Sequence, residues 1–302
     1  MSRRVSQFAL MRELEPAIER GLLGHVAQAT TWNSSDYVEP EMYWGQRRSM
    51  LTETAKAALV TTLLTHNNEA VYRADLAAAP MTRSAWSDWT DEWTAEKARH
   101  TAAIQDYLIA TRSVDPIALD RARFQCMTVG ISSSMEGDNF LRSIAYATID
   151  VMATMVSHRN AAVECNDPVA SALLGRIVAD QELQVAFLRS IGAAALDIAP
   201  AQMAAAITEV IMNFQMPGIG LPGFERSAML IARDGIYDLR RHLDEVLLPA
   251  LAHWRLFERA ELGLGARSTS ILSGFLDDLE IQAAGVESAD GAAMQARRLR
   301  AS

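Results

Sequence analysis

The segment at 140–164 constrains the fold more than any other, because it is apolar on nearly every side. It reads FLRSIAYATIDVMATMVSHRNAAVE and is long enough for many helical turns. A helix that is hydrophobic all round is normally surrounded by other protein elements. The sequence therefore predicts that this helix is buried on most of its faces.

The remaining pattern is also helical. Apolar residues recur at three- and four-residue spacing along 50–79, and 199–216 is similar. The segments 115–130 and 166–198 begin at Asp-Pro, a favourable helix start, and the first of them ends at glycine. No long run alternates with the period of a strand. We expect an all-α fold with four or more long helices around one core.

The chain shows neither an internal repeat nor a linker. We therefore predict a single domain over 1–283. The remaining segment, 284–302, loses the apolar periodicity, and we expect a flexible tail there.

Charge and composition limit the partners. The 302 residues carry a net charge of −9, which argues against nucleic acid as a general partner. The two cysteines, Cys126 and Cys165, form no disulfide framework and suit a reducing cytoplasm. Charged residues interrupt the N-terminal apolar run, so we expect no signal peptide, and no window is apolar enough to span a membrane.

Seven ordered segments carry a family resemblance: RELEP (12–16), WNSSDYV (32–38), WTAEKARH (93–100), DYLIATRSVDP (106–116), SHRNAAVECNDPVA (157–170), FQMPG (214–218) and HLDEVLLPALAHWRLFER (242–259). They resemble the soluble acyl-(acyl carrier protein) desaturases, most of all the actinobacterial branch. The resemblance implies a ferritin-like helical bundle that forms a homodimer. It also implies a substrate that is a fatty acyl chain on a carrier protein.

The resemblance further implies a di-iron centre inside the bundle. In that pattern two helices each supply one glutamate, and two more each supply a Glu-x-x-His pair. Residues three apart share one helix face, so a carboxylate and an imidazole both point inward.

This sequence departs from the pattern at all but one position. Only His100 is kept. Carboxylates next to the lost positions, such as Glu96 and Asp150, lie about 100° round the helix and are expected to point away from the centre. The residues at the six matching positions are His66, Lys97, His100, Val151, Gln181 and Gln184.

Four carboxylates are thus replaced by residues without negative charge, and Lys97 adds a positive one. An unpaired charge inside a bundle is costly, and a divalent cation beside a lysine is more so. We therefore predict that the di-iron centre is lost and that no cofactor is bound. Whether one weakly held metal binds near His66 and His100 stays open.

Lys97, His66 and His100 are the candidate catalytic residues. Lys97 either reaches water or a carboxylate such as Glu69, or it polarises a substrate oxygen. A Lys97→Met variant is then expected to fold as well as the wild type. His66 is either a core histidine or a catalytic one. The resemblance ties His100 to Asp180, with Trp32 beside them, and the alternative is a general acid or base.

Gln181, Gln184, Thr154 and Tyr146 are the candidate substrate contacts. The two glutamines either form a neutral hydrogen-bond network or donate to a substrate carbonyl. Thr154 stands where the family has a threonine near its oxygen site. Tyr146 belongs either to the core or to the lining of an acyl channel. Val151 is expected to fill the core.

Three functions follow from these residues. The first is a metal-independent enzyme that acts on an acyl or polyketide chain, by cyclisation, dehydration or isomerisation. The second is a non-catalytic partner that binds an acyl chain or a carrier protein. The third is a desaturase with an atypical metal site.

Overall fold

The computed structural model describes residues 5–44, 49–66, 84–129, 139–215, 223–263 and 265–301. For 127–129, 261 and 287–301 it describes the backbone alone. Every regular element in these ranges is a helix, which confirms the all-α prediction.

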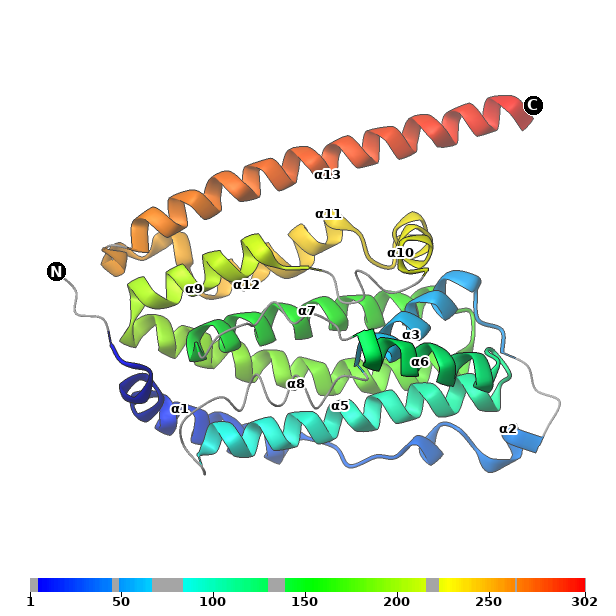
Figure 1. Cartoon of the computed structure of the whole chain (residues 1–302), viewed down its shortest axis with the longest axis horizontal. Coiled ribbons are helices and arrows are strands. Elements are labelled where there is room, and N and C mark those ends of the chain that lie inside the picture. The colour runs from blue at the N-terminus through cyan, green and yellow to red at the C-terminus, as the bar shows by residue number, and fades with distance from the viewer. Residues whose placement is uncertain are drawn as a thin grey trace.

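Five long helices form the bundle (Figure 1). They are α1 (Gln7–Gln28), α3 (Glu53–His66), α5 (Ala85–Ala110), α7 (Phe140–Glu164) and α8 (Pro168–Ile198). Of these, α7 lies between α8 on one side and α9 (Pro200–Asn213) on the other, and it also packs on α3. Most of its side chains are buried, as its all-round apolar character predicted.

Asp-Pro pairs start two of the helices as expected. The carboxylate of Asp167 accepts hydrogen bonds from the amides of Val169 and Ala170 at the start of α8. Asp115 accepts from the amide of Ile117 at the start of α6 (Pro116–Val129). These contacts satisfy amides that have no partner within a helix, and so they fix where each helix begins.

A second layer covers one side of α7. The helices α9 and α10 (Phe224–Arg233) lie in it, and α13 (Gly265–Ala301) lies across α9 (Figure 1). The shorter elements are η1 (Ser34–Asp36), α2 (Pro40–Trp44), α11 (Leu239–Arg241), the π-helical segment η2 (His242–Leu247), α12 (Leu248–His253), η3 (Leu256–Glu258) and η4 (Ala260–Leu262).

The backbone of α13 continues through residue 301. The expected boundary at 284 therefore does not coincide with a helix end, and the flexibility of 284–302 stays a prediction. None of the helices in the described ranges is long and apolar enough to cross a membrane.

Gly192 allows α8 to approach the α12 end closely. A methyl group at Gly192 would lie 2.7 Å from the indole nitrogen of Trp254, which is buried and donates to the carbonyl of Arg189. Gly175, on the same helix, has nothing within 4 Å of such a methyl group. The two glycines therefore form a matched pair that differs only in packing.

We predict that Gly192→Ala destabilises the fold, because Trp254 must move from a packed position, at a cost of about 1–3 kcal/mol. Gly175→Ala should gain up to about 1 kcal/mol from helix propensity. Urea unfolding of both variants measures this difference. Equal free energies of unfolding would show that the contact with Trp254 does not constrain the packing.

Candidate functional site

A buried ion pair lies at the centre of the bundle. The ammonium of Lys97, on α5, is 3.2 Å from a carboxylate oxygen of Asp150, on α7, and their side chains are 6% and 2% exposed. The same ammonium lies 4.4 Å from the ring centroid of Trp93. Lys97 thus pairs with a carboxylate as one interpretation proposed. The partner seen is Asp150, and Glu69 lies outside the described residues.

A second polar contact joins three helices around Glu96. One carboxylate oxygen of Glu96 accepts from the amide of Gln184 at 2.7 Å, and the other lies 3.1 Å from Nε2 of His25. Burial alone would lower the pKa of His25, but the hydrogen bond and charge of Glu96 outweigh it and raise that pKa. This contact ties α1, α5 and α8 together.

Glu96 and Asp150 both face the interior, so the expectation that they point away was wrong. The reason is that α5 and α7 are covered on more than one side, so a residue 100° round the helix still meets protein. Glu182, the third neighbour of a lost position, is exposed as expected.

Gln181 belongs to the same polar layer. Its carbonyl oxygen lies 3.0 Å from Nδ1 of His158, which must carry the proton to donate there. Burial lowers the pKa of His158 to about 4, so the ring is neutral near pH 7. The geometry of Gln181 and Gln184 matches the neutral-network interpretation of these residues.

His100 is held as the resemblance implied. Its Nε2 lies 3.0 Å from Asp180, and the indole of Trp32 donates to the same carboxylate at 2.8 Å. Arg176 also pairs with Asp180. Burial alone would raise the pKa of Asp180, but the hydrogen bonds from His100, Trp32 and Arg176 hold it at about 2.

These residues do not fit a di-iron centre. Val151 is buried hydrocarbon, and Gln181 and Gln184 are neutral and already bonded. Burial, together with the positive charge of Lys97, drives the pKa of His66 well below its usual value. Among the described residues, no group of three or more histidine, cysteine or acidic side chains is arranged to hold a metal ion. The six matching positions offer one cation, two amides, one hydrocarbon side chain and two imidazoles, and the nearby carboxylates of Glu96 and Asp150 are already bonded to other side chains.

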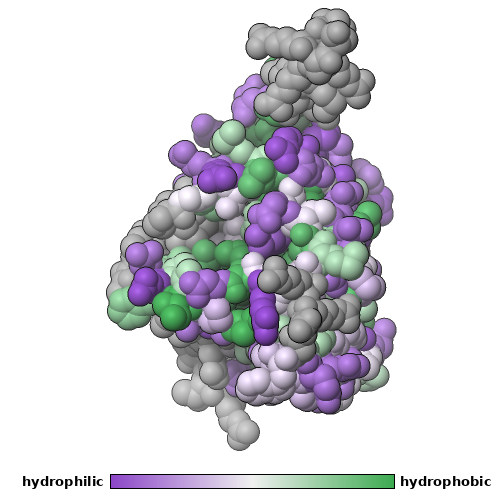
Figure 2. Space-filling model, turned by 90° about the vertical axis from the view of Figure 1, so that its right-hand side faces the viewer, coloured by the Kyte–Doolittle hydropathy of each residue, from purple (hydrophilic) through white to green (hydrophobic). Residues whose placement is uncertain are grey.

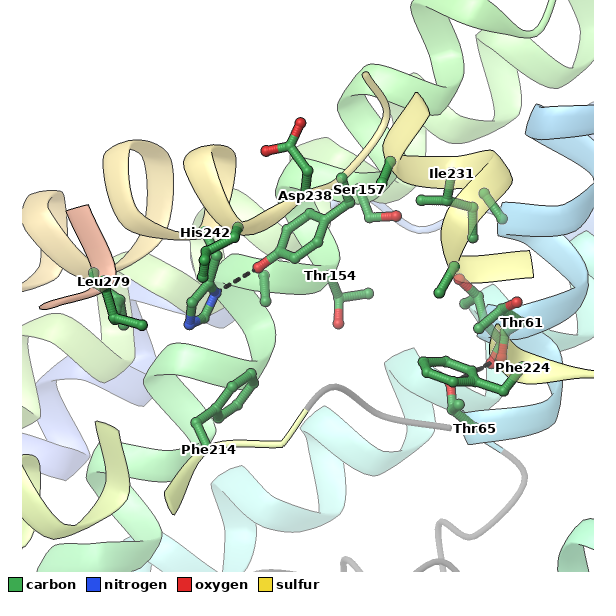
Figure 3. A pocket seen from close by; sticks show the side chains of 18 of the residues that line it. Thr61, Thr65, Thr154, Ser157, Phe214, Phe224, Ile231, Asp238, His242 and Leu279 are labelled. Carbon is green, nitrogen blue, oxygen red and sulfur yellow. Dashed lines mark hydrogen bonds between the residues drawn. The ribbon is translucent and has the colours of Figure 1, made fainter. Parts of the chain in front are cut away.

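An apolar cavity of about 400 Å³ lies beside this polar layer (Figure 3). The residues that line this cavity come mainly from α3, α7, α9, α10, η2 and α13. Figure 2 views the end of the bundle where α3 and α10 lie, and hydrophobic side chains gather around a hollow on that face. The larger apolar residues that line the cavity include Ile211, Phe214, Phe224, Ile231, Phe275 and Leu279.

One wall of the cavity carries a tyrosine–histidine pair. The hydroxyl of Tyr237 lies 2.7 Å from Nδ1 of His242 (Figure 3), and the ring of Phe214 stacks on His242 with centroids 5.1 Å apart. Burial raises the pKa of Tyr237 well above its usual value and lowers that of His242 to about 4. Both groups are therefore neutral near pH 7.

The sequence did not reveal this pair. His242 starts the π-helical segment η2, where one extra residue enters the turn. A search for apolar residues at the α-helical period does not detect this extra residue. The only available signal was that HLDEV opens one of the segments that carry the family resemblance.

The structure divides the predicted site residues into two groups. His66 and Thr154 line the cavity. Tyr146 does not, but its ring packs 6.0 Å from that of Phe214. The residues that lie in the polar layer rather than on the described cavity wall are Lys97, His100, Gln181 and Gln184, with Asp180 and Trp32 behind them.

The ion pair changes what is expected of Lys97→Met. Removing the ammonium leaves the carboxylate of Asp150 buried without its cation, so we predict a loss of about 3–5 kcal/mol rather than wild-type stability. The double variant Lys97→Met/Asp150→Leu removes both charges and should recover most of the loss. Urea unfolding of wild type, both single variants and the double variant gives the coupling energy. A loss below about 1 kcal/mol for Lys97→Met would contradict the pairing.

His242 predicts a pH dependence of stability. Its pKa is about 4 in the fold and 6.5 as a free group, so the unfolded chain binds more protons between these values. Its contribution is complete above pH 6.5 and falls by up to about 1.4 kcal/mol per pH unit as the pH drops toward 4. His242→Phe should show a shallower decline over that range, with the other histidines whose pKa burial lowers, His66, His100 and His158, contributing to the rest. Equal slopes for the two proteins would refute this assignment.

Comparison with known proteins agrees with the geometry of the bundle. The sequence model of the family described as Fatty acid desaturase matches residues 6–280. A Mycobacterium tuberculosis protein assigned provisionally as the acyl-[acyl-carrier-protein] desaturase DesA1 is 37% identical over 93% of this chain and 88% of its own. The X-ray structure of a second such protein, DesA2, covers 85% of this chain and 99% of its own, with 22% identity and a TM-score of 0.67. This chain belongs to the fatty acid desaturase family of the acyl-carrier-protein type.

Proposed function

We propose that this chain binds an acyl or polyketide chain, delivered on an acyl carrier protein, and acts on it without a resident di-iron centre. The observation that carries the proposal is the buried pair of Lys97 and Asp150. An ammonium in this layer opposes the binding of two iron cations, and the neutral glutamines beside it cannot offset their charge.

The cavity supports the part of the proposal that concerns the substrate. Its volume of about 400 Å³ falls within the range of small-molecule sites, and its walls are mostly aliphatic and aromatic. Burial of apolar surface would supply the affinity for such a chain. The names of relatives such as DesA1 point to a carrier-linked acyl substrate.

The chemistry that remains without iron is positioning and proton transfer. An apolar cavity can hold a flexible chain so that its reacting atoms meet, which suits cyclisation, dehydration or isomerisation. Of the three predicted catalytic residues, His66 is the one on the described cavity wall. Lys97 and His100 would act through it, by their charge and position, and their roles stay predictions.

A second candidate function is an iron-dependent desaturase with an atypical site. The 37% identity to DesA1 favours it, because relatives this similar often share an activity. A non-catalytic partner that binds acyl chains is the third. Homodimer formation, a cytoplasmic location and the absence of nucleic-acid partners also stay predictions.

Iron content separates the first two candidates. We predict that the protein, loaded with ferrous iron without oxygen and then desalted, retains far less than one iron per chain. The matched control restores the family pattern with His66→Glu, Lys97→Glu, Val151→Glu, Gln181→Glu and Gln184→His, and it should retain close to two. Elemental analysis and near-ultraviolet absorption after oxygen exposure provide the readouts.

Wild-type protein that keeps two irons and desaturates an acyl carrier substrate would establish the desaturase instead. Native mass spectrometry with acyl carrier protein carrying chains of different length tests the substrate part separately. A complex that forms with the acylated carrier and survives Phe214→Trp, which fills the cavity, would contradict binding in this cavity.

A further inference from the structure

We propose that the cavity selects a chain that carries an oxygen substituent, a hydroxyl or a carbonyl, which hydrogen bonds to His242 and His66. This inference rests on the proposed function, since it names the class of chain that the same cavity would take. The proposed function needs only an apolar cavity that holds a hydrocarbon chain. This inference adds a polar recognition site to the wall of that cavity.

His242 presents an unused nitrogen to the cavity. Tyr237 occupies Nδ1 at 2.7 Å, and in the described part of the chain no hydrogen bond reaches Nε2. When the tyrosine donates to Nδ1, the proton of the neutral ring sits on Nε2, and when it accepts from Nδ1, Nε2 is an acceptor. In either tautomer His242 offers one hydrogen-bonding nitrogen to a hydroxyl or a carbonyl on a ligand.

The orientation of this ring is fixed from two sides. Tyr237 holds it by the hydrogen bond, and Phe214 stacks on its face at 5.1 Å with planes 15° apart. The residue also opens the π-helical segment η2, a rare geometry that is frequent at functional sites. A ring held in this way recognises a ligand atom with little loss of freedom on binding.

His66 adds a second imidazole to the lining of the cavity. It ends α3, is 5% exposed, and lines the cavity. No hydrogen bond to another described residue engages its ring. A neutral imidazole has one donor and one acceptor, so His66 can bind either a hydroxyl or a carbonyl.

Two of the other polar groups on the wall are already engaged. The hydroxyl of Thr65 donates to the carbonyls of Thr61 and Thr62, and that of Thr154 donates to the carbonyl of Asp150. The hydroxyls of Thr61, Thr62 and Ser157 also line the cavity, and no hydrogen bond within the described part of the chain engages them. The two histidines therefore share the free hydrogen-bonding capacity of the lining with these hydroxyls. A saturated chain would cover them with hydrocarbon and leave them unsatisfied, which disfavours it relative to an oxygenated chain.

The test compares chains that differ by one oxygen. Octadecanoyl pantetheine and its 3-hydroxy, 10-hydroxy, 12-hydroxy and 3-oxo counterparts are titrated by calorimetry against the whole protein. We expect at least one oxygenated chain to bind about tenfold more tightly than the saturated one, the value of one good hydrogen bond.

His242→Phe keeps the ring volume and the stacking on Phe214 but removes the nitrogens. We expect it to bind the saturated chain at least as tightly as the wild type does, because one fewer imidazole is left unsatisfied, which also shows that it folds, and to lose most of the tenfold preference. The matched control Phe224→Leu changes a lining residue whose ring does not stack on His242, so it should weaken all chains alike and keep the preference. If His242→Phe does not fold, the ring resonances of His242 in the wild type, followed by NMR, should shift with the oxygenated chain and not with the saturated one.

Wild-type protein that binds saturated and oxygenated chains equally would overturn this inference and leave the proposed function standing. A preference that persists in both His242→Phe and His66→Leu would also overturn it. Protein that binds none of the chains, free or on a carrier, would overturn the inference and the proposed function together.

Discussion

The buried ion pair between Lys97 and Asp150 is the contact on which the interior of the bundle depends. Neither charge is stable there alone, since transferring an ion from water to the protein interior costs several kcal/mol. The pair joins α5 to α7 and lies among helices that cover both. Two other buried carboxylates also have a basic partner, because Glu96 faces His25 and Asp180 faces His100.

Because the buried charges pair with one another, the interior of the bundle divides into a polar layer and an apolar cavity. On one side of α7 most of the polar side chains bond to one another and form a connected network, although Nδ1 of His25 and Nε2 of His158 have no hydrogen-bond partner among the described residues. The apolar cavity lies on the other side of α7, and residues of α9, α10 and α13 line it. His66 stands between the two, near the charge of Lys97 on one side and at the cavity wall on the other.

Membership of the fatty acid desaturase family accounts for the scaffold but leaves the chemistry to the residues. The bundle, the long central helix and the contact of His100 with Asp180 and Trp32 all follow the family pattern. The positions that would hold iron in that pattern carry different chemistry here. A pair of neutral aromatic groups, Tyr237 and His242, instead supplies polar character to the cavity.

The sequence by itself determined the helices, their Asp-Pro starts and the burial of α7, and the loss of carboxylates at the ligand positions stays a prediction from the resemblance. Each of these depends on local order or on spacing along one helix. Only the tertiary structure decided that Asp150 and Glu96 face inward and that His242 reaches the cavity. Spacing defines an outward face only for a helix that has solvent on one side, and α5 and α7 do not. The π-helical turn likewise contains one extra residue, so α-helical spacing does not predict which way His242 points.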